Sequence, residues 1–195
     1  MKYNNGFSVW ELVVTICIVA IFANLAIPMM NDYIFERRSK LIATEIEDSF
    51  RFARSESLRL DVPVTICAAS ITIHNVLHGC QGKSKNNDWS LGMLSFINRD
   101  DLFKYNPNSK VRYTLFNDSK INNINIKIKS NNAFYVVNPD SSINILSNNM
   151  NYSCFWFSQK LMKSNLENIL VINKYGVGKF CTSNDAYNCE KLCAQ

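Results

Sequence analysis

The stretch NNGFSVWELVVTICIVAIFANLAIP, residues 4–28, places one carboxylate, Glu11, near the start of a run that is otherwise almost entirely apolar. From Phe7 to Met30 the only other clearly polar side chains are Ser8, Thr15 and Asn24. A transmembrane helix needs about 20 mostly apolar residues, so the length of this run predicts a helix that crosses a bilayer. An ionisable side chain inside such a run is costly and usually marks a function. Glu11 therefore needs a partner.

The residues before the apolar run indicate what that partner is. Residues 1–6 form a short polar leader that ends in Gly6, where a protease can approach the backbone closely. Cleavage after Gly6 would free an amine at Phe7, one helical turn from Glu11, on this chain or on a neighbour. A cleaved secretory signal fits less well, because its apolar region is uncharged and only about 7–15 residues long. A plain membrane anchor is the third alternative, and it explains less.

Composition predicts one globular domain after the anchor. The chain has 195 residues, of which 47% are apolar and 19% charged, and a net charge of +5 that favours anionic partners without specifying one. Beyond Cys17, an even set of six cysteines indicates disulfides and an oxidising compartment: Cys67, Cys80, Cys154, Cys181, Cys189 and Cys193. None of them has the C-x-x-C spacing of a zinc site. We expect no metal and no cofactor, and we interpret His74 and His78 as loop residues.

The cysteine spacing favours one pair. Cys67 and Cys80 bracket a 12-residue loop, and closing that loop would contribute about 3 kcal/mol in the loop-entropy model. The other four cysteines can pair among themselves in three ways, and we prefer the pairing of Cys154 with Cys181.

A second helical pattern follows the apolar run. Residues 31–60 contain no proline or glycine, and apolar or small side chains recur at helical spacing: Leu41, Ile42, Ile46, Ser49, Phe50, Ala53, Ser57 and Leu60. We therefore predict one long helix from about Phe7 to Leu60, bent near Pro28, with one stripe against the globular domain. The arginines in FERRSK and RFARSESLR are interpreted as a solvated face.

Beyond Asp61 the pattern changes to short apolar stretches separated by turns. The predicted strands are residues 62–68, 92–98, 111–116, 124–129, 133–138, 142–147, 153–158 and 168–174. Asn-Asn pairs at 86–87, 122–123, 131–132 and 148–149 supply turns. No helix-length crossover separates the strands, so an antiparallel sheet is expected. The prediction is an α+β chain: a leader (1–6), a transmembrane helix (7–30), its amphipathic continuation (31–60) and a β domain (61–195).

The segment GFSVWELVVTICIVAIFANLAIP resembles the N-terminus of type IV prepilins. The matching features are Gly6 before the cut, Phe7 as the new first residue, Glu11 fifth in the mature chain, and Pro28 near the end of the apolar run. The resemblance implies that a prepilin peptidase cleaves after Gly6 and methylates the Phe7 amine. It also implies an inner-membrane precursor with a periplasmic domain, in which Glu11 pairs with the Phe7 amine of the adjoining pilin. Trp10 departs from the pattern, since smaller residues are more usual there.

The later segments FRFARSESLRLDVPVTICA, DWSLGMLSFINRD and INKYGVGKFC resemble minor pilins of the FimT/GspH kind. This resemblance implies a minor pilin that assembles into or primes a type IV pilus, in some members with DNA binding for DNA uptake. It implies as an alternative a minor pseudopilin of type II secretion. A membrane-anchored adhesin or sensor outside any filament is a third alternative. No catalytic constellation occurs, so no enzymatic activity is expected.

DNA-binding members of that family resemble one another in a G-R-x-R motif before a cysteine. Residues 176–181 occupy the corresponding place, but Val177 and Lys179 stand where the arginines would be. Neither valine nor lysine can form the two parallel hydrogen bonds that an arginine makes to a phosphate. We therefore expect any DNA binding by this chain to be weaker than in the family members that have both arginines. Lys174, Lys127 and Lys129 are further DNA-binding candidates, although a solvated sheet face explains Lys127 and Lys129 as well.

Overall fold

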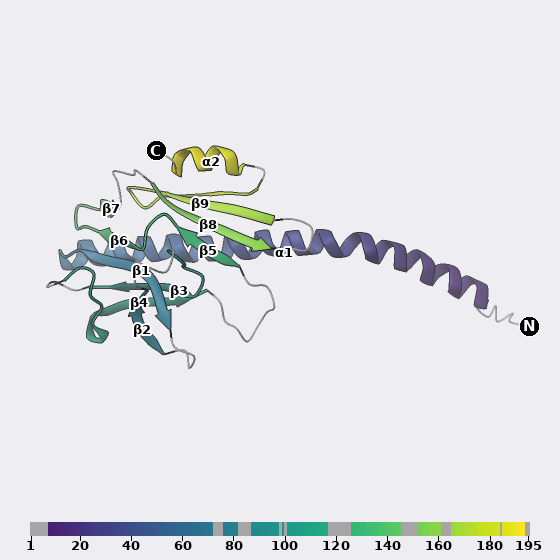
Figure 1. Cartoon of the computed structure of the whole chain (residues 1–195), viewed down its shortest axis with the longest axis horizontal. Coiled ribbons are helices and arrows are strands. Elements are labelled where there is room, and N and C mark those ends of the chain that lie inside the picture. Colours follow the sequence, from purple (N-terminus) through teal and green to yellow (C-terminus); the bar gives the residue numbers. More distant parts are fainter. Residues whose placement is uncertain are drawn as a thin grey trace, which may run out of the picture.

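The computed structural model describes residues 8–71, 76–81, 87–97, 99, 101–116, 126–145, 152–160, 165–183 and 185–193. Its elements, in chain order, are α1 (Val9–Leu60), β1 (Val64–Ile71), β2 (Leu77–Cys80), β3 (Gly92–Phe96), the short 3-10 helix η1 (Pro107–Ser109), β4 (Lys110–Leu115), β5 (Lys127–Ser130), β6 (Phe134–Val137), β7 (Ile143–Ile145), β8 (Tyr152–Lys160), β9 (Asn165–Asn173), β10 (Gly178–Cys181) and α2 (Ala186–Cys193). The C-terminal half of α1 lies among the strands, and its N-terminal half extends beyond them (Figure 1). The predicted α+β fold is confirmed.

Local signals set both ends of α1. Ser8 has extended backbone angles, and its hydroxyl accepts a hydrogen bond from the Trp10 amide at 3.4 Å, as an N-cap residue does. At the other end, Asp61 adopts a left-handed conformation with φ 51° and its amide donates to the Ser57 carbonyl. The helix continues through Pro28, and the side chains of residues 24–29 lie outside the described residues.

One stripe of α1 is buried against the strands, at positions that recur every three or four residues: Phe35, Ser39, Ala43, Ile46, Ser49, Phe50, Ala53 and Ser57. The predicted stripe is confirmed from Ile46 to Ser57. It is wrong at its two ends, because Leu41 is 64% exposed and Leu60 is 37% exposed. Leu41 lies between Ser39 and Ala43 and therefore faces the opposite side of the helix. Leu60 is the last residue of the helix, beyond the final buried position.

The strands form two antiparallel sheets. The first has the order β4-β3-β1-β6-β7, with β2 paired to β1, and the second has the order β10-β9-β8-β5. All eight predicted strands are present. Three elements, β2, β10 and α2, were not predicted, because they are short and their residues show no clear periodic pattern. Asn87 supplies a left-handed turn residue with φ 51°, as its Asn-Asn pair predicted.

Aromatic rings from α1 and both sheets form the centre of the core. Phe50 of α1 contacts Tyr135 of β6 and Phe155 of β8, with ring centroids 5.4 and 6.1 Å apart. Trp89 completes the cluster at 5.7 Å from Tyr135 and 5.3 Å from Phe155. All four side chains are at most 1% exposed. This cluster joins the long helix to both sheets.

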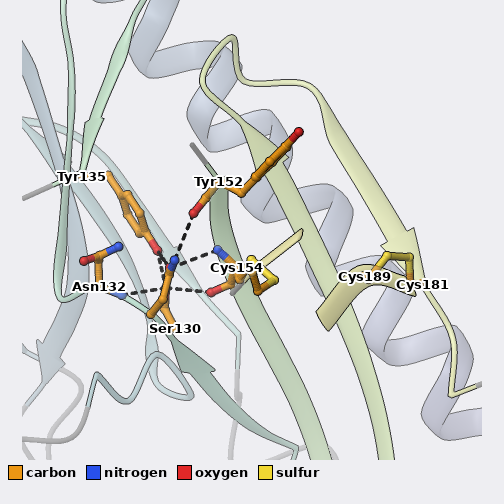
Figure 2. Close-up of a disulfide and its surroundings, with 9 residues drawn as sticks. Ser130, Asn132, Tyr135, Tyr152, Cys154, Cys181 and Cys189 are labelled. Atoms are coloured by element: carbon orange, nitrogen blue, oxygen red, sulfur yellow. Dashed lines mark hydrogen bonds between the residues drawn. A yellow bond between two sulfur atoms is a disulfide. The ribbon is translucent and has the colours of Figure 1, made fainter. Parts of the chain in front are cut away.

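A buried polar network lies beside these rings (Figure 2). The Tyr135 hydroxyl donates to Asn131 Oδ1 at 2.7 Å, and it also lies in hydrogen-bond contact with the Ser130 hydroxyl. Asn131 in turn bonds the main chain of β8, accepting from the Cys154 amide at 3.0 Å and donating to the Tyr152 carbonyl at 3.0 Å. Burial raises the pKa of the Tyr135 phenol, so this hydroxyl stays protonated and can donate. The network thus ties the β5–β6 connection to β8.

The disulfides confirm one predicted pair and correct another. Cys67 is bonded to Cys80, across the β1–β2 hairpin, as expected. The preferred pairing of Cys154 with Cys181 is wrong: Cys154 is bonded to Cys193, and Cys181 to Cys189 (Figure 2). Both bonds reach α2, a helix that the sequence pattern did not predict. They hold α2 over β8 and β9, on the side of that sheet opposite α1 (Figure 1).

Candidate functional site

The N-terminal part of α1 is apolar on every side and is not covered by its own chain. Every described residue from Ser8 to Phe22 is exposed, and the largest exposed fractions include Val9 at 80% and Phe22 at 66%. A helix that is apolar all round is normally buried, and a bare apolar surface of this extent marks an interaction site. In the part of the chain that the structure describes, no helix combines the length and the apolar character needed to cross a membrane.

Glu11 lies in the first turn of this exposed segment. Its carboxylate makes no hydrogen bond or ion pair with another described residue, while the helix dipole favours a negative charge at this end. The neighbouring polar group Thr15 is satisfied within the helix, since its hydroxyl donates to the Leu12 carbonyl at 2.8 Å. Gly6 and Phe7 lie outside the described residues. Within the described part of the chain, Glu11 is thus an exposed carboxylate without a side-chain partner.

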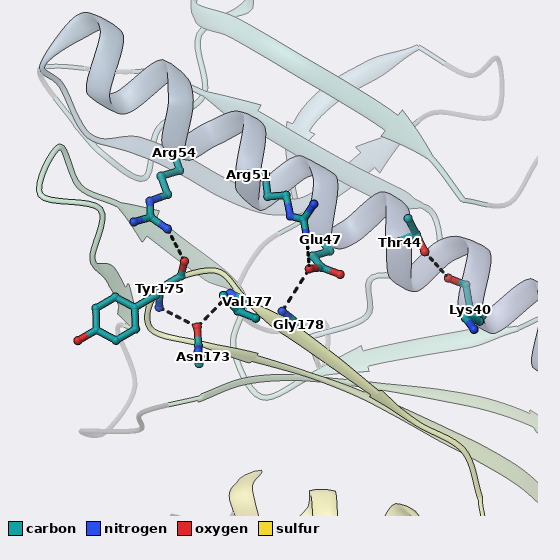
Figure 3. A network of polar contacts seen from close by, with 9 residues as sticks. All are labelled: Lys40, Thr44, Glu47, Arg51, Arg54, Asn173, Tyr175, Val177 and Gly178. Carbon is teal, nitrogen blue, oxygen red and sulfur yellow. Dashed lines mark hydrogen bonds and ion pairs between the residues drawn. The ribbon is translucent and has the colours of Figure 1, made fainter.

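The glycine turn between β9 and β10 packs against α1 (Figure 3). The Arg54 guanidinium donates to the Tyr175 carbonyl at 2.6 Å, and the Gly178 amide donates to Glu47 Oε1 at 3.3 Å. A Cβ at Gly178 would lie 3.0 Å from the Glu47 carboxyl group, so a larger residue there would have to displace this flexible side chain slightly. Arg51 forms an ion pair with the same carboxylate at 2.7 Å. The turn is thus fixed to the helix by charged side chains.

These contacts correct the interpretation of one helix arginine, Arg54, whereas Arg51 and Arg59 are exposed as predicted. The arginines of RFARSESLR were predicted to form a solvated face, but Arg54 is only partly exposed and donates a hydrogen bond to the turn. Glu47, Arg51 and Arg54 are spaced as i, i+4 and i+7, which places them on one side of the helix. That spacing was visible in the sequence. Its partner across the fold was not, because the turn lies 121 residues away from Arg54.

The four candidate DNA-binding lysines lie in different parts of the fold. Lys127 and Lys129 are exposed on β5 and alternate with buried side chains, as predicted. Lys179, on β10, is exposed on the same outer face of the sheet, because it pairs with Val171, whose side chain packs toward α2. Lys174 lies in the turn, with its Nζ 5.1 Å from the centre of the Tyr175 ring.

Lys179 and Lys129 do not form one cluster. They lie on the two edge strands of the four-stranded sheet, and three strand spacings of about 4.8 Å separate these strands. Helix α2 lies between them, over β8 and β9. A polyanion that touched both lysines would have to cross α2, which carries the exposed Lys191.

Among the described residues, no group of three or more His, Cys, Asp or Glu side chains is placed to hold a metal ion. His78 is exposed on β2, so its interpretation as a loop residue is wrong, and His74 lies outside the described residues.

Comparison with known proteins gives likeness only at the level of structure. No family model matches the chain, and no curated protein matches its sequence. Two crystal structures of the type IV minor pilin FimU from Pseudomonas aeruginosa (strain PAO1) resemble it. One has 14% identity and a TM-score of 0.46, and covers 74% of this chain and 94% of that chain. The other has 15% identity and a TM-score of 0.48, and covers 76% and 92%. This likeness concerns the fold alone.

Proposed function

We propose that this chain is a minor pilin that assembles into, or primes, a type IV pilus through its N-terminal helix. The observation that carries the proposal is the exposed apolar segment Val9–Phe22, which extends beyond the globular part and buries nothing within its own chain. Burying a Val, Leu, Ile or Phe side chain contributes about 1.5–3 kcal/mol, so a bundle of such helices would be strongly stabilised. Before assembly, the inner membrane would cover the same surface.

Glu11 supplies the register of that assembly. A carboxylate in an apolar bundle is tolerated when it meets a positive charge, and the prepilin-like N-terminus provides one: the amine of Phe7 after cleavage behind Gly6. In this proposal a prepilin peptidase cleaves and methylates the chain, and Glu11 of one subunit pairs with the Phe7 amine of the next. The exposed, unpaired state of Glu11 in the single chain supports this assignment.

Two measurements test the proposal. Mass spectrometry of the protein from membranes should find a chain that begins at Phe7 and carries an N-methyl group. Glu11→Ala should preserve membrane association but reduce incorporation into filaments by at least tenfold, which corresponds to about 1.4 kcal/mol of lost pairing. Glu36→Ala is the matched control, because Glu36 is an exposed glutamate of the same helix outside the apolar segment. Retention of Met1, or normal incorporation of Glu11→Ala, would contradict the proposal.

The two alternatives are separated by where the assembled protein is found. A type II secretion pseudopilin would use the same helix and the same cleavage, but it would copurify with secretion components and be absent from surface pili. An anchored adhesin or sensor would keep its helix in the membrane without cross-linking to other pilins. Cysteine cross-linking from the N-terminal helix, followed by identification of the partner, distinguishes all three.

Weak binding of DNA, independent of sequence, is a second proposal for the same protein. It is supported by the exposure of Lys179 and Lys174 next to the glycine turn and by the net positive charge. Lys127 and Lys129 would contribute only to a polyanion that also crosses α2. Because such contacts are to phosphates, the logarithm of the affinity should fall with the logarithm of salt concentration, with a slope of about 0.9 per contact on duplex DNA.

Lys179→Ala should lower that slope by about one unit, and Val177→Arg with Lys179→Arg should raise the affinity. Lys40→Ala is the control, since Lys40 is an exposed lysine on α1 away from the turn. Fluorescence anisotropy with a labelled duplex over a salt series measures both quantities. An unchanged slope in the Lys174→Ala, Lys179→Ala double variant would remove the DNA proposal and leave the filament proposal intact.

A further inference from the structure

A groove of about 380 Å³ lies on the outer face of the four-stranded sheet, next to α2, and it plays no part in the proposed assembly. Its lining residues are Lys129, Ser130, Trp156, Ser158 and Glu167. The volume falls in the range of about 300–1,000 Å³ that small-molecule sites occupy.

Strand register brings four of the five lining side chains to the outer face, whereas the Ser130 side chain points into the core. Lys129 of β5 is paired with Trp156 of β8, and Ser158 of β8 is paired with both Lys127 of β5 and Glu167 of β9. Paired residues on antiparallel strands share a face with Cβ atoms about 4.5–5.5 Å apart. The indole of Trp156 is therefore flanked by an ammonium group, with a hydroxyl and a carboxylate two residues further along the strand.

The polar groups around the indole are unengaged. Within the described part of the chain, the side chains of Lys129, Ser158 and Glu167 make no hydrogen bond or ion pair. Two arginines of α1 behave differently, because Arg51 is paired with Glu47 and Arg59 with Glu56. The groove thus offers a donor, a hydroxyl and an acceptor that a ligand can use without breaking an existing contact.

The base of the groove is held rigidly. Trp156 is half-buried and packs against a cluster that includes Cys154, Ile169 and Cys181. Two disulfides tie this cluster to α2, and β8 pairs with β9 along its whole length. A rigid aromatic side chain costs little conformational entropy on binding, so it suits a recognition site.

We propose that this groove binds an uncharged pyranose unit of an oligosaccharide or polysaccharide. One face of a pyranose ring presents C–H groups, which can pack on the apolar face of an indole. Its hydroxyls both donate and accept hydrogen bonds, which matches the Lys129 donor, the Glu167 acceptor and the Ser158 hydroxyl. A phosphate chain matches less well, because the Glu167 carboxylate would repel it. Asp88, which forms a β-bridge with Lys129, adds a second exposed carboxylate near the groove. Because the groove carries both positive and negative side chains, it favours a neutral polyhydroxyl ligand over a polyanion.

The test uses the full chain in a detergent without a sugar headgroup, with maltotriose and triacetylchitotriose as probes. Saturation-transfer NMR should detect at least one of them with a dissociation constant on the order of 0.1–1 mM, within the range that a small site supplies. Trp156→Ala should weaken binding at least tenfold, Glu167→Gln about threefold, and Trp156→Phe less than Trp156→Ala. Tyr187→Ala is the control, because Tyr187 is an exposed aromatic residue of α2 outside the groove, and it should leave binding unchanged.

Two outcomes would overturn the proposal. One is that neither trisaccharide binds at about 10 mM, well above the expected dissociation constants. The other is that an oligothymidylate binds in a Trp156-dependent manner while the sugars do not, which would assign the groove to single-stranded nucleic acid. If Trp156→Ala does not fold, Trp156→Phe and Glu167→Gln carry the test. Neither outcome bears on the filament proposal, because the groove lies on the β domain and the assembly helix is at the other end of the chain.

Discussion

Phe50 lies where α1 meets both sheets, and replacing it tests whether the aromatic cluster holds the helix in place. The side chain is 1% exposed, and its ring lies 5.4 Å from that of Tyr135 and 6.1 Å from that of Phe155. Removal of a fully buried phenylalanine to alanine costs about 3–5 kcal/mol, which includes the cavity that remains. Each lost edge-to-face ring contact contributes about 0.5–1.5 kcal/mol of that total.

We therefore expect Phe50→Ala to lower the free energy of unfolding by about 4 kcal/mol, a large fraction of the roughly 5–15 kcal/mol that a domain possesses. Phe50→Leu keeps most of the apolar volume and should cost about 1–2 kcal/mol. Leu58→Ala is the matched control, because Leu58 is on the same helix but 55% exposed. It should change stability by less than about 0.5 kcal/mol.

Urea unfolding of the detergent-solubilised chain, followed by near-ultraviolet circular dichroism, measures these differences. Trp89 is fully buried in the same cluster and should dominate the signal. A loss below about 1.5 kcal/mol for Phe50→Ala, or equal effects of Phe50→Ala and Leu58→Ala, would refute the reasoning.

Three further predictions concern other parts of the fold. Gly92→Ala should destabilise by about 3 kcal/mol or more, because φ is +153° and a Cβ would lie 2.3 Å from a main-chain oxygen of β4. Gly176→Ala should cost about 1–2 kcal/mol in the same urea assay, because φ is +78° but a Cβ would make only an ordinary contact, at 3.9 Å from Ile143. Replacing both Cys154 and Cys193 by alanine opens a loop with a sequence separation of 39 and should cost up to about 4 kcal/mol, and non-reducing peptide mapping should recover that pair. Burial raises the pKa of the Glu45 carboxyl group, and Arg112 opposes this shift. The wild type should therefore lose stability relative to Glu45→Gln as the pH rises from the pKa of Glu45 in the unfolded chain to its pKa in the folded protein.

The sequence by itself determined the elements that depend on neighbours along the chain. Helix α1 was predicted from the apolar run that starts at Phe7, the absence of proline and glycine from residues 31–60, and the stripe from Ile46 to Ser57. These signals are local, because helical contacts join residues three or four apart. Eight strands followed from short apolar stretches between turn residues. Cys67 and Cys80 could be paired because they bracket one short hairpin loop.

The tertiary structure alone decided what depends on residues far apart in the chain. Arg54 bonds a turn 121 residues away, and the exposure of Leu41 depends on which side of α1 the two sheets cover. Cys154 and Cys193 pair because α2, too short to show a pattern, folds back over β8 and β9. Strand order likewise places Lys179 and Lys129 at opposite edges of one sheet, and register places Lys129 beside Trp156. The physical reason is that local propensity and periodicity are encoded over a few residues, whereas strand pairing and register arise only when distant segments bury a common core.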